Sequence, residues 1–437
     1  MKELKETRQG VVQERALLVE VEIAGDCQRE RDHRDRLEEL ARLAEAAGAI
    51  VVARASQKRP GINPATYVGS GKAEELKTEA ELQKADVIIF DNDLTLAQVR
   101  NLEEVTAMKV IDRSELILDI FAARARTIES QLQVELAQLE YTYPRLKKMW
   151  THLSRIEGGL GVRGPGETQL ETDRRLVRDR ILELKHRLAE IDARKEREVR
   201  SRSEAMTVGI VGYTNAGKSS LLNALTGARA YVEDKLFATL DTRTRVWKMA
   251  RCPRVLLSDT VGFIRDLPHH LVASFKATLE EAIHADLLLH VVDVSSGHIH
   301  TDVAAVEAVL GEIGCKDKPQ LLVLNKADLV TDAIDLSLAE RAWPGSIAVS
   351  AVTGQGLDEL ARQVRERLVG PEREMTIVIS AGDGRLQAWI KQHATVLART
   401  VEDGNIVHRV RLPERLVAEI PRIATGPFRV TPDGEAC

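Results

Sequence analysis

The sequence has few cysteines, and none of them is placed to form a disulfide framework or a zinc site. Cys27, Cys252, Cys315 and Cys437 are spread over 437 residues, with no C-x-x-C pair and no neighbouring cluster of histidines. This spacing excludes a zinc finger and a small disulfide-stapled fold. It is typical of a protein from a reducing compartment.

Long hydrophobic runs are absent as well. No stretch approaches the roughly 18 consecutive apolar residues of a membrane-spanning helix, and the N-terminal MKELKETRQG lacks the apolar segment of a signal peptide. We therefore expect a cytoplasmic protein with no integral membrane association.

An excess of one charge sign is also lacking. The chain has 62 lysines and arginines and 67 aspartates and glutamates, a net charge of −5. A protein that coats nucleic acid over its whole surface would be strongly basic, so nucleic-acid contact must be local, and we expect no DNA partner. With 44% apolar and 30% charged residues, the composition is globular, which excludes wholesale disorder, collagen and a coiled-coil rod.

The first part of the chain alternates short apolar runs with a helical pattern. Strands are predicted at residues 16–23, 50–55, 87–90 and 109–112, and a helix at 34–46. Such alternation is typical of βαβ units. We therefore predict an α/β domain over residues 1–113.

Residues 114–203 have the pattern of two long amphipathic helices. Apolar side chains recur every three or four residues, at Leu132, Leu136, Leu139 and Tyr143 and then at Val177, Ile181, Leu184, Leu188 and Ile191. Two such stripes can pack together, so we predict a helical hairpin. Residues 145–202 hold 16 basic and 10 acidic residues, a net charge of +6 that leaves −11 elsewhere. Either this arm meets an anionic partner or its charges form an ordinary solvated surface.

The turn of the hairpin is rich in glycine. Its notable residues are Gly158, Gly159, Gly161, Arg163, Gly164 and Gly166. A connection between antiparallel helices needs only about 2 to 8 residues of any flexible kind, whereas this one carries a specific positive charge. Of a flexible connector and a functional tip, we favour the tip.

From residue 204 onward, strands and helices alternate again. Apolar strands are predicted at 207–211, 255–257, 287–292, 321–324 and 347–349. Strands that are apolar throughout are buried on both faces, as in a mostly parallel sheet covered by helices. We predict that this domain spans 204–370. A small α/β module should follow over 371–437, with strands near 375–379 and 406–411 around a helix at 385–398.

The first of these strands leads into a phosphate-binding loop. Residues 212–219 read GYTNAGKS, which matches G-x-x-x-x-G-K-[ST], and a helical segment follows. Backbone N–H groups of such a loop surround phosphates, Lys218 neutralises the β- and γ-phosphates, and the Ser219 hydroxyl ligates Mg²⁺. The nucleotide-binding residues expected here are Gly212, Tyr213, Thr214, Asn215, Ala216, Gly217, Lys218, Ser219 and Ser220.

Two later motifs favour guanine over adenine. The segment NKAD, residues 325–328, follows one predicted strand, and Ser350-Ala351 follows the next. The Asp328 carboxylate can accept from both N1–H and the exocyclic amine of guanine, and polar sites of this kind discriminate by roughly 10⁴. We predict GTP as the substrate, with a base site made by Asn325, Lys326, Asp328, Ser350 and Ala351.

Two further segments are expected to respond to the γ-phosphate. In DTVG, residues 259–262, Asp259 can hold Mg²⁺ through water and the Gly262 N–H can contact the γ-phosphate. Upstream, Thr239 in FATLD is the expected Mg²⁺ ligand of the first switch. The predicted metal ligands are thus Ser219, Thr239 and Asp259, and the predicted catalytic residues are Lys218, Thr239 and Gly262.

Other polar groups have plainer interpretations. The turn from Gly69 to Lys72 precedes a predicted helix and is either an anion or ATP site or, as we favour, a tight strand-to-helix turn. The histidines show no ligand spacing and are expected at the surface. Arg243, Arg245 and Arg265, near the predicted switches, are expected to be ordinary surface charges.

Four motifs considered together carry a family resemblance. GGLGVRGPGETQLETDRR precedes the nucleotide-binding domain, DNDLTLAQ lies further upstream, and FATLDT and DTVGFI lie within the domain. Over residues 10–370 the chain resembles the HflX family of ribosome-associated GTPases, which are TRAFAC-type proteins with a Ras-like G domain.

The resemblance implies a cellular role. It implies a Mg²⁺-dependent GTPase that binds the large ribosomal subunit and its rRNA, and that splits or recycles stalled ribosomes under heat or other stress. It also implies that the helical hairpin carries its Gly-rich tip, with the six residues named above as ribosome contacts, toward the peptidyl-transferase centre.

One position departs from many GTPases. Directly after DTVG, where they place a glutamine to orient the attacking water, this chain has Phe263. We therefore expect slow intrinsic hydrolysis, about 10⁻⁴ to 10⁻³ s⁻¹, and activation by the ribosome. Two alternatives remain: a ribosome-assembly GTPase acting on precursor particles, and a nucleotide-regulated RNA-binding scaffold with slow turnover. We expect a monomer.

Overall fold

The structure is a computed structural model of the chain. It describes residues 14–24, 33–156, 165–201, 205–227, 237, 243–249, 252, 254–265, 281–402 and 404–432. These residues form two compact units. The first unit extends to Glu196 and also includes Phe237, and the second holds the other described residues.

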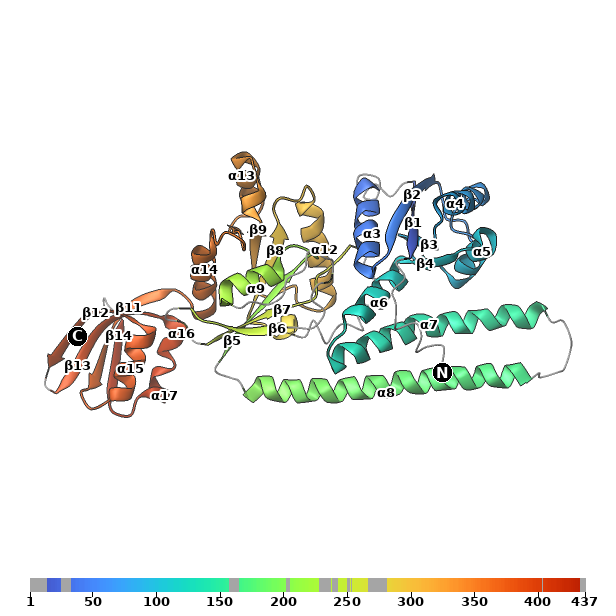
Figure 1. The fold of residues 1–437 in the computed structure, drawn as a ribbon. Helices are drawn as coiled ribbons and strands as arrows, with labels where there is room; N and C mark the ends of the chain where they lie inside the picture. The colour runs from blue at the N-terminus through green and yellow to red at the C-terminus, as the bar shows by residue number, and fades with distance from the viewer. Residues whose placement is uncertain are drawn as a thin grey trace. The chain divides into compact units, whose positions relative to one another are not determined.

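A parallel sheet forms the body of the first unit. Its strands are β1 (Arg15–Ile23), β2 (Ile50–Arg59), β3 (Val87–Phe90) and β4 (Lys109–Asp112), in the order β2-β1-β3-β4. The helices are α3 (His33–Ala47), α4 (Ser70–Gln83), α5 (Leu96–Thr106) and α6 (Arg113–Arg124). In Figure 1, α3 and α6 cover one face of the sheet and α4 and α5 the other. The α/β prediction for this region is confirmed.

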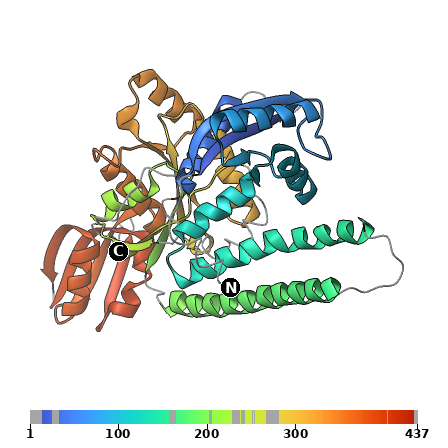
Figure 2. The same cartoon turned by 45° about the vertical axis from the view of Figure 1, so that its right-hand side comes forward.

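Two long antiparallel helices follow, α7 (Ile128–Ile156) and α8 (Pro165–Ser201), as Figures 1 and 2 both show, and they belong to the first unit as far as Glu196. Their contact is the predicted apolar stripe, made by Leu136, Leu184 and Leu188 with Leu132, Leu139 and Ile181 around them. Ion pairs flank the stripe. Arg180 donates to both oxygens of Glu135 at 2.8 and 2.9 Å, and Lys185 pairs with Glu140 at 2.8 Å. The predicted hairpin is confirmed.

A polar contact joins the hairpin to the end of the sheet. Asp112, the last residue of β4, accepts from the Glu115 N–H at 2.9 Å and so caps the start of α6. The same carboxylate oxygen accepts from the Tyr141 hydroxyl of α7 at 2.5 Å. Because Asp112 is fully buried, this contact defines where the hairpin leaves the sheet.

A six-stranded sheet forms the core of the second unit. Five strands are parallel, β5 (Met206–Gly212), β7 (Val255–Asp259), β8 (Leu287–Asp293), β9 (Gln320–Asn325) and β10 (Ile347–Ala348). The edge strand β6 (Arg243–Trp247) is antiparallel to β7 and was not predicted. The order is β10-β9-β8-β5-β7-β6, so β5 lies in the interior of the sheet. A mostly parallel sheet is confirmed.

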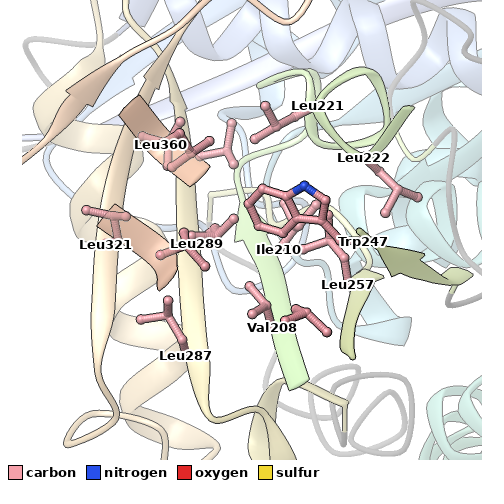
Figure 3. Packing of buried hydrophobic residues seen from close by; sticks show 14 of the residues in the cluster. Val208, Ile210, Leu221, Leu222, Trp247, Leu257, Leu287, Leu289, Leu321 and Leu360 are labelled. Atoms are coloured by element: carbon pink, nitrogen blue, oxygen red, sulfur yellow. The ribbon is translucent and has the colours of Figure 1, made fainter. Parts of the chain in front are cut away.

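Side chains from both sheet and helices fill this core. Figure 3 shows the Trp247 ring packed beside Ile210 and Leu257, with Leu221 and Leu222 above them. These leucines belong to α9 (Lys218–Thr226), the helix that follows the predicted phosphate-binding loop. Further helices described in this domain are α12 (Ile299–Glu312), α13 (Ala333–Ala342), α14 (Leu357–Val369) and the short 3-10 helix η1 (Ala327–Leu329).

An antiparallel sheet ends the described chain. Its strands are β11 (Glu372–Ser380), β12 (Thr395–Glu402), β13 (Asn405–Pro413) and β14 (Phe428–Pro432), in the order β12-β13-β11-β14. The helices are α15 (Gly384–His393), α16 (Glu414–Val417) and α17 (Ile420–Ile423). The predicted helix over 385–398 is wrong beyond His393. Residues 395–402 pair with β13 instead, as their β-branched threonines and valines favour.

No helix of the described residues is long and apolar enough to span a bilayer. The 37 residues of α8 are long enough, but they are rich in charge.

Candidate nucleotide site

The phosphate-binding loop lies at the carboxyl end of β5, where ligands bind in open parallel sheets. Two glycines are required by close packing. A Cβ on Gly212 would lie 2.2 Å from the Val291 carbonyl oxygen, and one on Gly217 would lie 2.2 Å from Asn325 Nδ2. Gly217 also has a left-handed φ of 89°. These contacts place the loop against β8 and the NKAD segment.

Lys218, the first residue of α9, is buried beneath the loop. Its Nζ donates to the carbonyl oxygens of Gly212 at 3.1 Å and Tyr213 at 2.8 Å. Burial lowers the pKa of Lys218 to about 8, against the opposing effect of the Asp259 carboxylate. The ammonium group is therefore still charged at neutral pH, in a position to meet an anionic group on the loop.

Two side chains whose oxygen atoms could bind a metal ion lie beside Lys218. The Ser219 hydroxyl donates to Asp259 Oδ2 at 2.5 Å, and Asp259, at the end of β7, is fully buried. Hydroxyl and carboxylate oxygens are ligands that suit Mg²⁺, so the pair fits that ion. Among the described residues no cluster of three or more His, Cys, Asp or Glu side chains forms a separate metal site. The third predicted ligand, Thr239, lies outside the described residues.

The NKAD segment holds the loop from the other side. Asn325, buried at the end of β9, donates from Nδ2 to the Ala216 carbonyl at 2.8 Å. Its Oδ1 accepts from the Ala351 N–H at 3.1 Å. One amide side chain thus joins the phosphate-binding loop to the Ser350-Ala351 turn. Local sequence patterns did not predict this bridging role, since the two partners lie 109 and 26 positions away.

The remaining base-site residues follow Asn325 closely. Lys326 has a left-handed φ of 64°, and its Nζ pairs with Asp293 Oδ2 at 2.6 Å. Asp328 lies in η1 with an exposed side chain. Ser350 is buried, and its hydroxyl accepts from the Thr353 N–H at 3.0 Å. All of these predicted residues therefore lie at the same edge of the sheet as the phosphate-binding loop.

The remaining loop and switch residues have distinct environments. Thr214 and Ala216 are buried, Asn215 is exposed with a left-handed φ of 62°, and Ser220 lies in the first turn of α9. A Cβ on Gly262 would lie 2.7 Å from Thr214 Cγ2 and 3.0 Å from Lys218 Nζ, so the Gly262 backbone packs directly on the loop.

Only part of the predicted first switch and tip is described. Phe237, two positions before Thr239, belongs to the first unit, where its ring meets the Phe121 ring edge-on with centroids 4.6 Å apart. Of the tip residues, Gly166 lies in the first turn of α8. Gly158, Gly159, Gly161, Arg163 and Gly164 lie outside the described residues.

Three expectations about individual side chains need correction or narrowing. Arg265 is not a free surface charge: its guanidinium lies 3.4 Å from Asp302 Oδ1, and both side chains are only 11% exposed. His290 and His408 are buried rather than superficial, at 2% and 1% exposure, because both lie on strands whose neighbours are apolar.

The contacts at Gly69 favour a tight strand-to-helix turn over an anion or ATP site. The Gly69 N–H donates to Gln57 Oε1 at 3.0 Å, and Lys72 Nζ lies 3.0 Å from Glu75 Oε2. The Gly69 amide and the Lys72 ammonium group are thus engaged within the protein. The contacts support a strand-to-helix turn.

Family models match four successive segments of the chain. They are described as "GTP-binding GTPase N-terminal" for residues 34–122, "GTP-binding GTPase Middle Region" for 124–202, "50S ribosome-binding GTPase" for 207–326 and "HflX C-terminal domain" for 337–431.

Curated relatives match over most of their length. The chain is 46% identical to "GTPase HflX" of Caldanaerobacter subterraneus over 374 residues, 85% of this chain and 86% of that one. It is 45% identical to "GTPase HflX" of Escherichia coli over 408 residues, 92% and 94% of the two chains. Among solved structures, a GTP-binding protein from Sulfolobus solfataricus in complex with GDP is 25% identical, with 81% of this chain and 98% of that chain covered and a TM-score of 0.42.

Proposed function

This chain belongs to the HflX family of GTPases, and from that premise we propose that it binds the large ribosomal subunit and splits or recycles stalled ribosomes, with hydrolysis stimulated by the ribosome. The observation that carries the proposal is the pairing of a guanine-nucleotide site with a long helical hairpin on a separate unit. A description of the G-domain family as 50S ribosome-binding supports the choice of partner. Heat or another stress is the proposed setting.

We assign the nucleotide roles as follows. Backbone N–H groups of residues 212–217 and the start of α9 surround the phosphates. Lys218 leaves the two carbonyls that it now contacts and neutralises the β- and γ-phosphates. The Gly262 N–H contacts the γ-phosphate, and Asp328 pairs with guanine.

We propose a Mg²⁺ requirement as well. The Ser219 hydroxyl would bind the ion directly, Asp259 through water, and Thr239 when GTP is present. Bound there, the ion would supply positive charge to the phosphate oxygens on which charge develops during hydrolysis. The proposal rests on the contact between Ser219 and Asp259 at 2.5 Å.

The length of the hairpin suits a contact with the ribosome through its tip. At about 1.5 Å per residue, the 29 residues of α7 and the 37 residues of α8 extend for about 40 to 55 Å. In the described middle section, Arg180 and Lys185 are paired with acidic side chains of α7. The net positive charge of the arm is therefore expected to act near the tip, where the predicted ribosome contacts Gly158 to Gly166 lie.

GTP turnover by the purified protein, alone and with isolated large subunits at matched salt, tests this function. We expect slow turnover alone, about 10⁻⁴ to 10⁻³ s⁻¹, and a large rise on mature subunits, because Phe263 offers no amide to orient water. Splitting of 70S ribosomes into subunits, followed by sedimentation, is the second readout.

Two other outcomes would redirect the assignment. If mature subunits leave turnover flat while precursor particles raise it, the protein is an assembly GTPase. If no particle raises it although GTP binds tightly, the protein is a nucleotide-regulated RNA-binding scaffold. Either result contradicts the splitting function but leaves the GTP site intact.

A further inference from the structure

The segment after DTVG lies directly along the phosphate-binding loop. The Phe263 N–H donates to the Gly212 carbonyl at 3.1 Å, and the Phe263 carbonyl accepts from the Thr214 N–H at 2.7 Å. Together they form a parallel bridge between Tyr213 and Phe263. Because both bonds join backbone groups, side-chain identity does not determine them.

A third bond continues this contact and depends on a side chain. The Arg265 N–H donates to the Tyr213 hydroxyl oxygen at 2.9 Å. The Arg265 guanidinium in turn pairs with Asp302, in the first turn of α12. Arg265 is therefore held through its backbone by the phosphate-binding loop and through its side chain by a neighbouring helix.

These bonds determine where Gly262 lies. Gly262 precedes the bridged residue Phe263, and its backbone packs so closely that an added Cβ would come within 3.0 Å of Lys218 Nζ. The Phe263 ring is 2% exposed and carries no amide that could hydrogen-bond a water molecule. At position 263 the described segment therefore offers the reacting phosphate its backbone rather than a side-chain amide.

We propose that Tyr213 is a positioning residue for GTP hydrolysis. Its hydroxyl holds the Arg265 amide and thereby keeps Gly262 to Arg265 aligned on the phosphate-binding loop. Donors aligned before the reaction stabilise the transition state without reorganisation. The inference rests on the proposed contact between the Gly262 N–H and the γ-phosphate.

Tyr213→Phe is the direct test, because it keeps the ring and removes the acceptor. We expect the single-turnover rate at saturating GTP to fall about three- to tenfold, the range for one neutral hydrogen bond. The Kd for GDP, which has no γ-phosphate, should stay within about twofold, because the hydroxyl acts on the switch segment. The melting temperature should fall by no more than a few degrees, as for the loss of one neutral hydrogen bond.

Tyr143→Phe is the matched control. It removes a hydroxyl that accepts from Arg178 Nη2 at 3.0 Å in the hairpin, far from the loop in sequence. Turnover of this variant without ribosomes should equal that of the parent protein.

Asp302→Asn tests the same segment through the side chain of Arg265. It removes the charge partner of Arg265, so turnover should fall again, by less than in Tyr213→Phe. Because both substitutions release Arg265, the double variant should lose less activity than the product of the two single losses.

Several results would overturn the inference. Unchanged or faster turnover in Tyr213→Phe means that the hydroxyl does not position the segment for hydrolysis. Equal losses of turnover and GDP affinity mean that the residue only maintains the loop. Lys218→Ala separates this failure from failure of the nucleotide site: retained GDP binding in that variant contradicts the site itself.

Discussion

Asp328 is the residue on which the choice of base is expected to depend. Its carboxylate can accept from two guanine donors, whereas an asparagine at this position offers one acceptor and one donor. Asp328→Asn should therefore weaken GTP binding by on the order of 100-fold, because one of the two charge-assisted bonds is lost and the other becomes a neutral bond. It should also narrow the preference for GTP over ITP, which lacks the exocyclic amine. Competition binding measures both effects.

Asp335→Asn provides the control for that substitution. Asp335 is an exposed carboxylate in the first turn of α13, in the same domain. Its variant should bind GTP and ITP as the parent protein does. If Asp328→Asn behaves in the same way, Asp328 does not contact the base.

His290 makes the stability of the G domain depend on pH. Burial, and then the charge of Lys218, lower the pKa of His290 to about 4. The unfolded chain has a histidine pKa of about 6.5. Between about pH 4 and pH 6.5, the histidine is therefore protonated in the unfolded chain and neutral in the folded chain. The free energy of unfolding should fall as pH drops through that window, by up to about 1.4 kcal/mol per pH unit.

His290→Leu should remove this contribution. Urea unfolding measured at several pH values should show a shallower loss of stability below about pH 6.5 in the variant. His284→Asn, at an exposed position of the same domain, should leave the pH dependence unchanged. An unaltered slope in His290→Leu would assign the acid sensitivity to other groups.

At the scale of elements, the hairpin is held by a narrow apolar contact. Leu184 is fully buried against α7. Leu184→Ala should cost about 2 to 4 kcal/mol of local stability, because it leaves a cavity between only two helices. Faster amide exchange in α7 and α8 would report this. Intrinsic GTP turnover should be unaffected, while stimulation by large subunits should fall.

Leu182 offers a matched control on the same helix. Its side chain is 59% exposed, so Leu182→Ala removes the same atoms without opening a cavity. Equal exchange rates in the two variants would contradict the hairpin contact.

At the scale of the whole molecule, the tip and the GTP site should act together only on the ribosome. Replacing residues 158–166 by a Gly-Ser linker of equal length should leave intrinsic turnover unchanged. It should abolish both the stimulation by large subunits and the splitting of 70S ribosomes, since the linker keeps the hairpin but lacks the specific tip. Unchanged splitting would make the tip a mere connector.

Elements with strong local patterns were predictable from the sequence. The strand at 287–293 is apolar apart from His290 and Asp293, and the stripe with Leu184 has regular helical spacing, so period and composition agree with the structure. Strand β6 was missed because its five residues alternate poorly and lie half exposed at an edge. Residues 395–398, the first half of strand β12, were taken for helix because their apolar spacing is ambiguous without the partner strand β13.

The same distinction between local and long-range contacts applies to the candidate site. The sequence by itself determined the phosphate-binding loop, the NKAD segment and DTVG, because each is a contiguous run whose backbone and side chains act locally. Tertiary structure alone decided that Asn325 bridges two loops, that Tyr213 holds Arg265, and that His290 is buried near the Lys218 charge. Those contacts join residues 26 to 109 positions apart. They exist only because parallel strands bring their carboxyl ends to one edge of the sheet.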